Sequence, residues 1–218
     1  MSLSVGIVAE GVTDQLVIQN ILLGFFKERL AEPDIYFDQP PDISAEQRFG
    51  SWALVMTYLQ QGRYAEVFQL RDYLVVQIDS DVSPQKHFEV PHTDPTTGKA
   101  LKDEELVSRI RERLCQWIGA EDLQRYAGRF LFAICVHELE CWLVPLWENE
   151  RHHHATTNCT RRVQQGQNRA KVKRPINKLE ARSYDEASRE LRKVKALKRA
   201  GGSQPSLGLF LGDLNTVA

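Results

Sequence analysis

The sequence lacks several patterns that would assign a function class at once. Its four cysteines show no Cys-x-x-Cys spacing. Cys115, Cys135 and Cys141 lie in apolar runs, which favours reduced thiols in the core. No apolar run is long enough to span a bilayer and no signal peptide is present, so we expect a cytoplasmic protein without a membrane partner. No GxGxxG or Walker pattern follows Gly11, which therefore predicts a tight turn and not a phosphate loop.

The charges are divided unevenly along the 218 residues. Residues 1–150 hold 13 Lys and Arg against 24 Asp and Glu, whereas residues 151–200 hold 15 against 4. Such asymmetry suggests a polyanionic partner for the basic part. The alternative is that residues 189–199 form one solvated helix face. The chain is 42% hydrophobic, enough for one α/β domain with a modest appendage.

Three apolar runs predict buried strands, each followed by a helical pattern. The strands are expected at residues 4–9, 73–78 and 130–136, with a shorter one at 34–38. The helices are expected at 13–26 with Thr13 as the N-cap, at 49–60, at 103–118 and from Leu139 onward. This alternation predicts an α/β fold with a mainly parallel sheet flanked by helices. Residues 84–102 are expected to be an exposed loop.

The composition of the sequence changes after Asn149. Residues 150–172 are polar and predict a mobile loop, and residues 184–198 predict a basic helix that Gly201-Gly202 ends. Residues 206–214 fit a last short helix. We therefore expect residues 1–149 to form the main domain, and residues 150–218 to form a basic loop and helical extension packed on it.

All three strong strands end in acidic residues. Glu10 ends the first, Asp79 and Asp81 end the second, and Glu138 and Glu140 end the third. Ligands of open parallel sheets bind beyond the carboxyl ends of the strands, so these side chains should converge. Converging carboxylates repel one another unless a cation neutralises them. Oxygen ligands without a cysteine or histidine set favour Mg²⁺ or Mn²⁺ over zinc.

The five acids are not equivalent in this prediction. Asp79 and Asp81 are two apart in extended backbone, so both can face one cation. Their alternative role is to cap the loop after the strand. If a helix has begun by His137, Glu138 and Glu140 point in different directions. Glu138 is then the nearer ligand, and Glu140 is a second ligand, an orienting group or merely an acid in the first helical turn.

These motifs resemble those of a known family. Val5 to Asp14 is a hydrophobic strand followed by Glu-Gly-x-Thr-Asp, and the Asp-x-Asp of residues 79–81 follows a second strand. This resembles the TOPRIM domain of topoisomerases, primases and OLD-family nucleases. Residues 137–143, His-Glu-Leu-Glu-Cys-Trp-Leu, resemble the His-Glu-x-Glu-x-Trp-Leu element of small TOPRIM-like proteins from bacterial defence and mobile-element neighbourhoods. The resemblance covers residues 4–145, although its second motif lies further along the chain than in most TOPRIM domains.

The resemblance implies a TOPRIM or Rossmann-like fold and a role for each acid. Glu10 would be the general acid or base of phosphodiester chemistry, with Glu138 as a second catalytic candidate. Asp79 and Asp81 would hold the metal, and Glu138 and Glu140 are added as metal ligands because they follow the third strand. Asp14 and His137 are candidates for supporting positions.

The function that these observations favour is Mg²⁺- or Mn²⁺-dependent hydrolysis of nucleic acid, DNA rather than RNA, as an anti-phage or anti-plasmid effector. The phosphate contacts would come from Lys171, Lys173, Arg174 and Lys178. An activating protein partner and a homo-oligomer are left open. The alternatives are a non-catalytic binding module of the same fold and a metal-dependent hydrolase of small phosphoesters.

Overall fold

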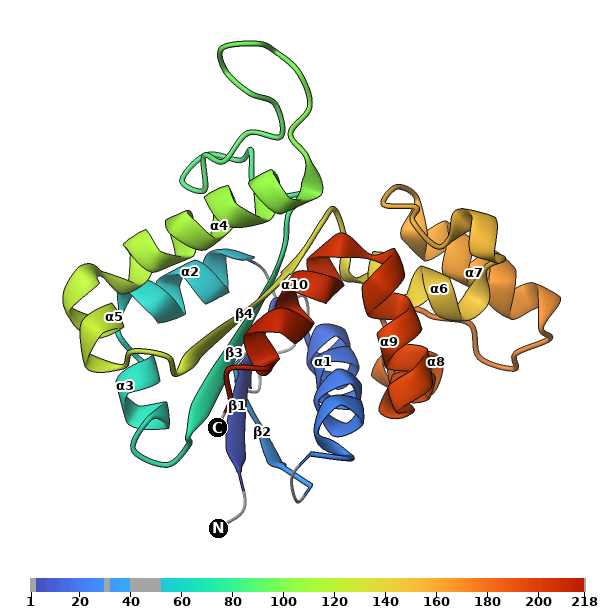
Figure 1. Cartoon of the computed structure of the whole chain (residues 1–218), viewed down its shortest axis with the longest axis horizontal. Helices are drawn as coiled ribbons and strands as arrows, with labels where there is room; N and C mark the ends of the chain where they lie inside the picture. The colour runs from blue at the N-terminus through green and yellow to red at the C-terminus, as the bar shows by residue number, and fades with distance from the viewer. Residues whose placement is uncertain (1–2, 30–31, 40–51, 218) are drawn as a thin grey trace.

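The described residues form a parallel β-sheet covered by helices on both faces. The structure is a computed structural model and describes residues 3–29, 32–39 and 52–217. The strands are β1 (Ser4–Val8), β2 (Asp34–Gln39), β3 (Tyr73–Asp79) and β4 (Phe130–Cys135). They pair in the order β2-β1-β3-β4, and every pairing is parallel (Figure 1). The predicted fold class, an α/β protein with a mainly parallel sheet, is confirmed.

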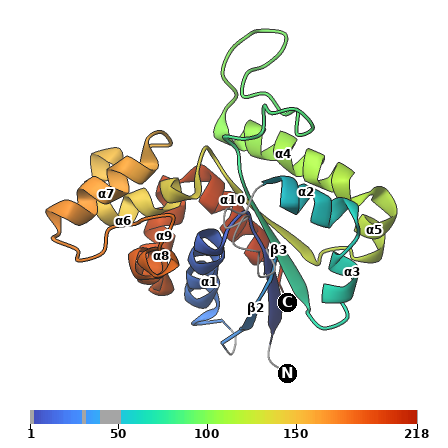
Figure 2. The same ribbon diagram turned by 180° about the vertical axis from the view of Figure 1, so that it is seen from behind.

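The helices lie on two sides of this sheet (Figures 1 and 2). They are α1 (Val12–Phe26), α2 (Trp52–Gln60), α3 (Tyr64–Val67), α4 (Asp103–Ile118), α5 (Ala120–Arg125), α6 (Val144–Trp147), α7 (Cys159–Arg169), α8 (Ala181–Ser188), α9 (Val194–Ser203) and α10 (Pro205–Leu214). Short 3-10 turns are η2 (Leu139–Leu143), η3 (Glu150–His152) and η4 (Arg189–Arg192). In the described part of the chain, no helix is both long and apolar enough to cross a membrane.

Alternate residues of each strand fill two separate cores. In β3, Val75 packs with α1 and the C-terminal helices, whereas Leu74 and Val76 pack with α2 and α4. This follows from the strand geometry, because successive side chains point to opposite faces. Both faces of β1, β3 and β4 are covered, which explains why these three strands are mostly apolar and do not alternate with polar residues. The edge strand β2 differs, because its Tyr36 and Phe37 are exposed.

Most predicted elements are present, and five local predictions are wrong. The basic helix predicted at residues 184–198 is divided among α8, η4 and α9. Gly11 and not Thr13 occupies the N-cap of α1. A 3-10 turn, η2, precedes α6 where a regular helix was expected. Helix α7 occupies the middle of the predicted loop at residues 150–172, and Gly201-Gly202 lie inside α9 instead of ending a helix. Residues 49–51 of the predicted second helix lie outside the described residues.

The prediction for Cys141 is also wrong. Cys141 in η2 forms a disulfide with Cys159, the first residue of α7, while Cys115 and Cys135 are free thiols. Apolar surroundings are shared by buried thiols and buried disulfides alike. Because Cys159 lies in a polar stretch 18 residues away, no local pattern indicates that the two cysteines pair.

Candidate carboxylate site

Glu10 and Asp79 meet at the carboxyl ends of the two central strands. The Asp79 backbone N–H donates to Oε1 of Glu10 over 2.7 Å. Gln77, which is fully buried in β3, stabilises this contact through two hydrogen bonds. Its side-chain oxygen accepts the Glu10 N–H at 3.2 Å, and its Nε2 donates to Asp79 Oδ1 at 2.9 Å. The two acids therefore converge as predicted, and hydrogen bonds from their backbone N–H groups hold them at the ends of β1 and β3.

A second set of hydrogen bonds joins the ends of β3 and β4. The buried Ser80 Oγ accepts the His137 N–H at 2.7 Å, and the Asp81 N–H donates to the His137 carbonyl at 3.1 Å. His137 adopts a left-handed backbone conformation with φ of 61°, which is uncommon for a residue other than glycine. This turn brings Glu138 to the same edge of the sheet as Asp81, whose side chain is exposed.

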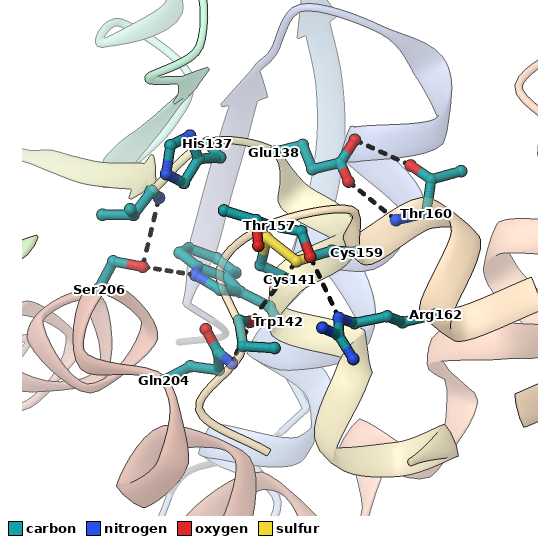
Figure 3. Close-up of a disulfide and its surroundings, with 12 residues drawn as sticks. His137, Glu138, Cys141, Trp142, Thr157, Cys159, Thr160, Arg162, Gln204 and Ser206 are labelled. Carbon is teal, nitrogen blue, oxygen red and sulfur yellow. Dashed lines mark hydrogen bonds between the residues drawn. A yellow bond between two sulfur atoms is a disulfide. The ribbon is translucent and has the colours of Figure 1, made fainter. Parts of the chain in front are cut away.

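Glu138 is held by the start of α7. Thr160 donates to its two carboxylate oxygens, from the backbone N–H and from Oγ, each over 2.8 Å (Figure 3). Cys159 lies beside Thr160, and its disulfide to Cys141 fixes α7 against the turn that carries Glu138 (Figure 3). Glu138 and Asp81 both line a pocket of about 400 Å³. Glu138 therefore faces this pocket, but its two carboxylate oxygens already have partners.

Glu140 is the most deeply buried of the predicted ligands, with 2% of its surface exposed. The Tyr184 hydroxyl of α8 donates to its Oε1, and the Lys178 ammonium lies 3.8 Å from the same oxygen. The negative carboxylate raises the pKa of Tyr184, an effect second to that of burial. Glu140 thus binds the C-terminal segment and does not cap a helical turn.

The carboxylates at this edge of the sheet interact electrostatically as one group. Burial raises the pKa of Glu10 to about 8, and Asp14 and Asp81 add to the shift while the Asp79 N–H and Lys178 oppose it. Burial, followed by repulsion from Glu140, raises the pKa of Asp14 to about 7. Burial and the neighbouring acids raise the pKa of Asp79 well above its usual range. These shifts mean that negative charge at the site is poorly neutralised.

Lys178 is the main cation of this group. Burial lowers the pKa of its ammonium, but attraction by Glu140, Asp79 and Asp14 outweighs that effect, and the net shift is upward. Among the described residues, no other lysine or arginine forms an ion pair with one of the predicted site acids. Lys178 was predicted to contact nucleic-acid phosphates, whereas here its charge is directed at the carboxylates.

The other predicted phosphate-contacting residues are placed differently from one another. Arg174 forms ion pairs with Glu180 at 3.2 Å and with Glu186 at 3.4 Å. Lys171 and Lys173 are exposed, and no acid in the described part of the chain pairs with either. Only these two lysines of the predicted set combine exposure with an unpaired charge.

The carboxylates suit a divalent cation by the chemistry of their donor atoms more than by the distances between those atoms. Their donors are all oxygen, which suits Mg²⁺ or Mn²⁺. Within the described ranges, however, the one group of three or more ligand residues with donor atoms all within 4.8 Å is Glu138, Cys141 and Cys159. Its two sulfurs are joined in the disulfide. Binding of one cation by Asp79, Asp81 and Glu138 would therefore require these side chains to move closer together.

Sequence reasoning missed the residues that hold the acids in place. Gln77 could have been noticed, because it is a polar residue inside an otherwise apolar strand and lies two positions before Asp79. Thr160 and Tyr184 carry no such signal, since a threonine and a tyrosine in polar segments are ordinary. Both lie beyond residue 149 and reach the site only through the tertiary fold.

Comparison of the chain with protein-family models, with curated proteins and with solved structures found no match. The resemblance to TOPRIM domains therefore stays a prediction from the motifs at the ends of β1, β3 and β4.

Proposed function

We propose that this protein is a TOPRIM-like nuclease that hydrolyses phosphodiester bonds with Mg²⁺ or Mn²⁺. The observation that carries the proposal is the meeting of Glu10 and Asp79 at the ends of β1 and β3, among further acids and with one lysine nearby. A group of desolvated carboxylates with raised pKa values is costly for the fold. Such a cost is typical of functional sites, where a bound cation offsets it.

The residues would divide the work according to their surroundings. Asp79 and Asp81 would hold the metal, with Glu138 and Glu140 as further ligands. Once bound, the metal would polarise a phosphoryl oxygen and lower the pKa of a bound water. Glu10 has a pKa of about 8, so near neutrality it can hold or release a proton. Its Oε1 accepts the Asp79 N–H, which leaves Oε2 as the oxygen for that proton.

The pocket beside Asp81 and Glu138 has features that suit a phosphate backbone. Its lining residues are all polar or charged and include His137 and Arg161. Arg161 is exposed at the start of α7, and its side chain has neither an ion pair nor a hydrogen bond within the described residues. A free guanidinium can bind a phosphate through two parallel hydrogen bonds. We infer that a strand of nucleic acid passes Arg161 on its way to the carboxylates.

The proposal is tested by cleavage assays on plasmid DNA, single-stranded DNA and RNA. We expect cleavage with Mn²⁺ or Mg²⁺, none with EDTA, and a loss of at least about 100-fold in Asp79→Asn, because positioning of the metal depends on this carboxylate. Asp94→Asn is the matched control, since Asp94 lies in the segment 84–102 and does not line the pocket beside Asp81. Absence of metal-dependent cleavage, or full activity of Asp79→Asn, would refute the proposal.

The same preparation distinguishes the alternative substrate class. Hydrolysis of bis(p-nitrophenyl) phosphate or a nucleotide, without cleavage of any polymer, would identify a small-phosphoester hydrolase. Arg161→Met separates the two further, because it should weaken polymer cleavage more than hydrolysis of the small ester.

A further inference from the structure

A second polar cavity lies on the α2 and α3 side of the sheet. It measures about 220 Å³ and shares no lining residue with the pocket beside Asp81. Strand β2, helices α2 and α3, and the turn before β3 surround it. Its lining residues are Asp38, Tyr58, Arg63, Glu66, Val67, Leu70 and Arg71. We call it the Arg71 pocket.

Polar atoms without partners gather in this pocket. Asp38 Oδ2, the Tyr58 hydroxyl and Arg71 Nε are buried and have no hydrogen-bond partner. Within the described ranges only four side-chain atoms are in this state, and three of them belong to the Arg71 pocket. Tyr58 is 97% buried, with 3% of its surface exposed. Leaving a buried donor or acceptor unsatisfied costs about 1–3 kcal/mol, so three in one cavity indicate a missing binding partner.

The backbone makes room for Asp38. A Cβ on Gly6 in β1 would lie 2.3 Å from Asp38 Oδ2, so a residue with a side chain there would displace the carboxyl group. Burial raises the pKa of Asp38, and Arg71 opposes the shift.

The lining holds two arginines and two acids, Asp38 and Glu66, and the arginines supply its cationic groups. The Arg71 guanidinium stacks on Tyr36 with its Cζ 3.3 Å from the ring centroid, and the Arg63 guanidinium lies 5.9 Å from the Tyr58 ring centroid. No acid of the described residues forms an ion pair with either arginine. Nη1 of Arg71 donates to the Leu70 carbonyl at 3.3 Å, and stacking fixes the direction of the guanidinium while its unpaired Nε–H stays available for an anion.

We propose that the Arg71 pocket binds a small anion of the phosphate class, held by Arg71, Arg63 and the Tyr58 hydroxyl. The volume is below the range of about 300–1,000 Å³ that is usual for drug-sized ligands, which favours a phosphate or a phosphate-ended fragment. Free phosphate and the terminal phosphate of a nucleic acid share this chemistry. The inference does not depend on the proposed nuclease activity.

Binding is tested by isothermal titration calorimetry of the full chain with inorganic phosphate, in EDTA so that the carboxylate site plays no part. We expect saturable binding and a higher melting temperature with phosphate. In Tyr58→Phe, we expect binding to be about 3- to 10-fold weaker, the usual effect of one lost hydrogen bond. Without phosphate this variant should be at least as stable as the wild type, because the hydroxyl that it removes has no partner.

Two further variants and one further ligand complete the experiment. Arg71→Lys keeps the charge but loses the planar set of guanidinium N–H donors, so it should bind phosphate more weakly. Arg182→Lys is the control, and this variant of a distant exposed arginine should bind phosphate normally. Tighter binding of a 5′-phosphorylated dinucleotide than of inorganic phosphate would identify nucleic-acid ends as the source. The proposal is overturned if wild type shows no saturable phosphate binding, if Tyr58→Phe binds equally well, or if a crystal grown in phosphate holds only water beside Tyr58.

Discussion

At the scale of single residues, three acids of the carboxylate site are held by hydrogen bonds before any cation arrives. Glu10 accepts from the Asp79 backbone, Glu138 from Thr160 and Glu140 from Tyr184. These bonds position the side chains but do not cancel their charge. Protonation therefore becomes the way in which the metal-free protein relieves the repulsion.

This predicts how stability depends on pH. The pKa values of Glu10 and Asp14 in the folded protein, about 8 and about 7, lie above their ordinary values of 4.5 and 3.8. Between its ordinary pKa and its pKa in the folded protein, each group holds more protons in the folded state than in the unfolded chain. The free energy of unfolding must therefore fall as pH rises through that range. Each such group contributes up to about 1.4 kcal/mol per pH unit. Denaturant unfolding in EDTA at pH 6 and pH 8 measures the slope.

Two variants test whether this dependence of the free energy of unfolding on pH comes from the carboxylate site. Glu10→Gln should flatten it, because the amide does not titrate. Asp94→Asn should leave it unchanged, because the pKa of Asp94 is lowered by hydrogen bonds to Thr97 and this group titrates below the window. Mn²⁺ should restore more stability at pH 8 than at pH 6, since metal binds the ionised carboxylates. A metal-free protein that is more stable at pH 8 would contradict this account.

Lys178→Gln tests the role of the lysine as the counterion of the acids. We expect the metal-free variant to lose about 1 kcal/mol at pH 8, a modest amount because the Lys178 side chain is 61% exposed. Mn²⁺ should make up part of the loss, because it neutralises the same carboxylates. Lys173→Gln is the control, since that exposed lysine pairs with none of the described acids. Equal melting temperatures for the two variants in EDTA would show that Lys178 does not neutralise the site.

The positions of the acids could be predicted from the sequence better than the residues that contact them. Glu10, Asp79 and Asp81 could be placed because the end of an apolar strand is visible in the sequence and parallel strands end together. The inward direction of Lys178 could not be predicted, because a lysine in a basic segment carries no sign of the buried Glu140 across the fold. The same reason hid Tyr184.

At the scale of elements, the disulfide is the covalent link between η2 and α7. It closes a loop with a sequence separation of 18 residues, for which the chain-entropy account gives about 3 kcal/mol of stabilisation. We expect a reducing agent to lower the melting temperature of the wild type and to have no effect on a Cys141→Ser/Cys159→Ser variant. Thiol titration of the denatured protein checks the pairing: two free thiols agree with it, and four would contradict it.

Gly24 lets α1 approach the C-terminal segment closely. A Cβ at this position would lie 2.0 Å from the Leu191 carbonyl oxygen in η4. Gly24→Ala should therefore destabilise the protein by about 1–3 kcal/mol through overpacking. Gly202→Ala in α9 is the matched control, because its Cβ meets nothing within 4 Å and alanine favours a helix. Thermal unfolding of both variants decides, and a neutral Gly24→Ala would disprove the close contact.

The elements that sequence patterns predicted well are those with a strong apolar period. Strands β1, β3 and β4 and helix α4 belong to this group. Helix α7 escaped notice because it buries few apolar side chains, chiefly Cys159 and Val163, and is anchored by a disulfide and by Glu138. Its stability comes from contacts that are distant in sequence, and local periodicity does not report them.

At the scale of the whole molecule, residues beyond 149 are part of one core with the sheet. Cys159, Tyr184 and Leu197 belong to the same buried cluster as Val5 and Val75. Helix α1 packs against α8, η4 and α9. The acids therefore come from the ends of the strands, from η2 and from α1. Thr160, Lys178 and Tyr184, which bind two of them, come from the C-terminal segment. The site is complete only when both parts of the chain are folded together.

The central claim is that the acids at the ends of β1, β3 and β4 bind a divalent cation. The most direct test is anomalous diffraction from a crystal soaked in Mn²⁺. We predict a manganese peak bonded to Asp79 and Asp81, with Glu10 beside it and the Lys178 ammonium moved away from Glu140. A fully soaked crystal without a peak at Asp79, or with manganese bound only elsewhere on the protein, would contradict the account.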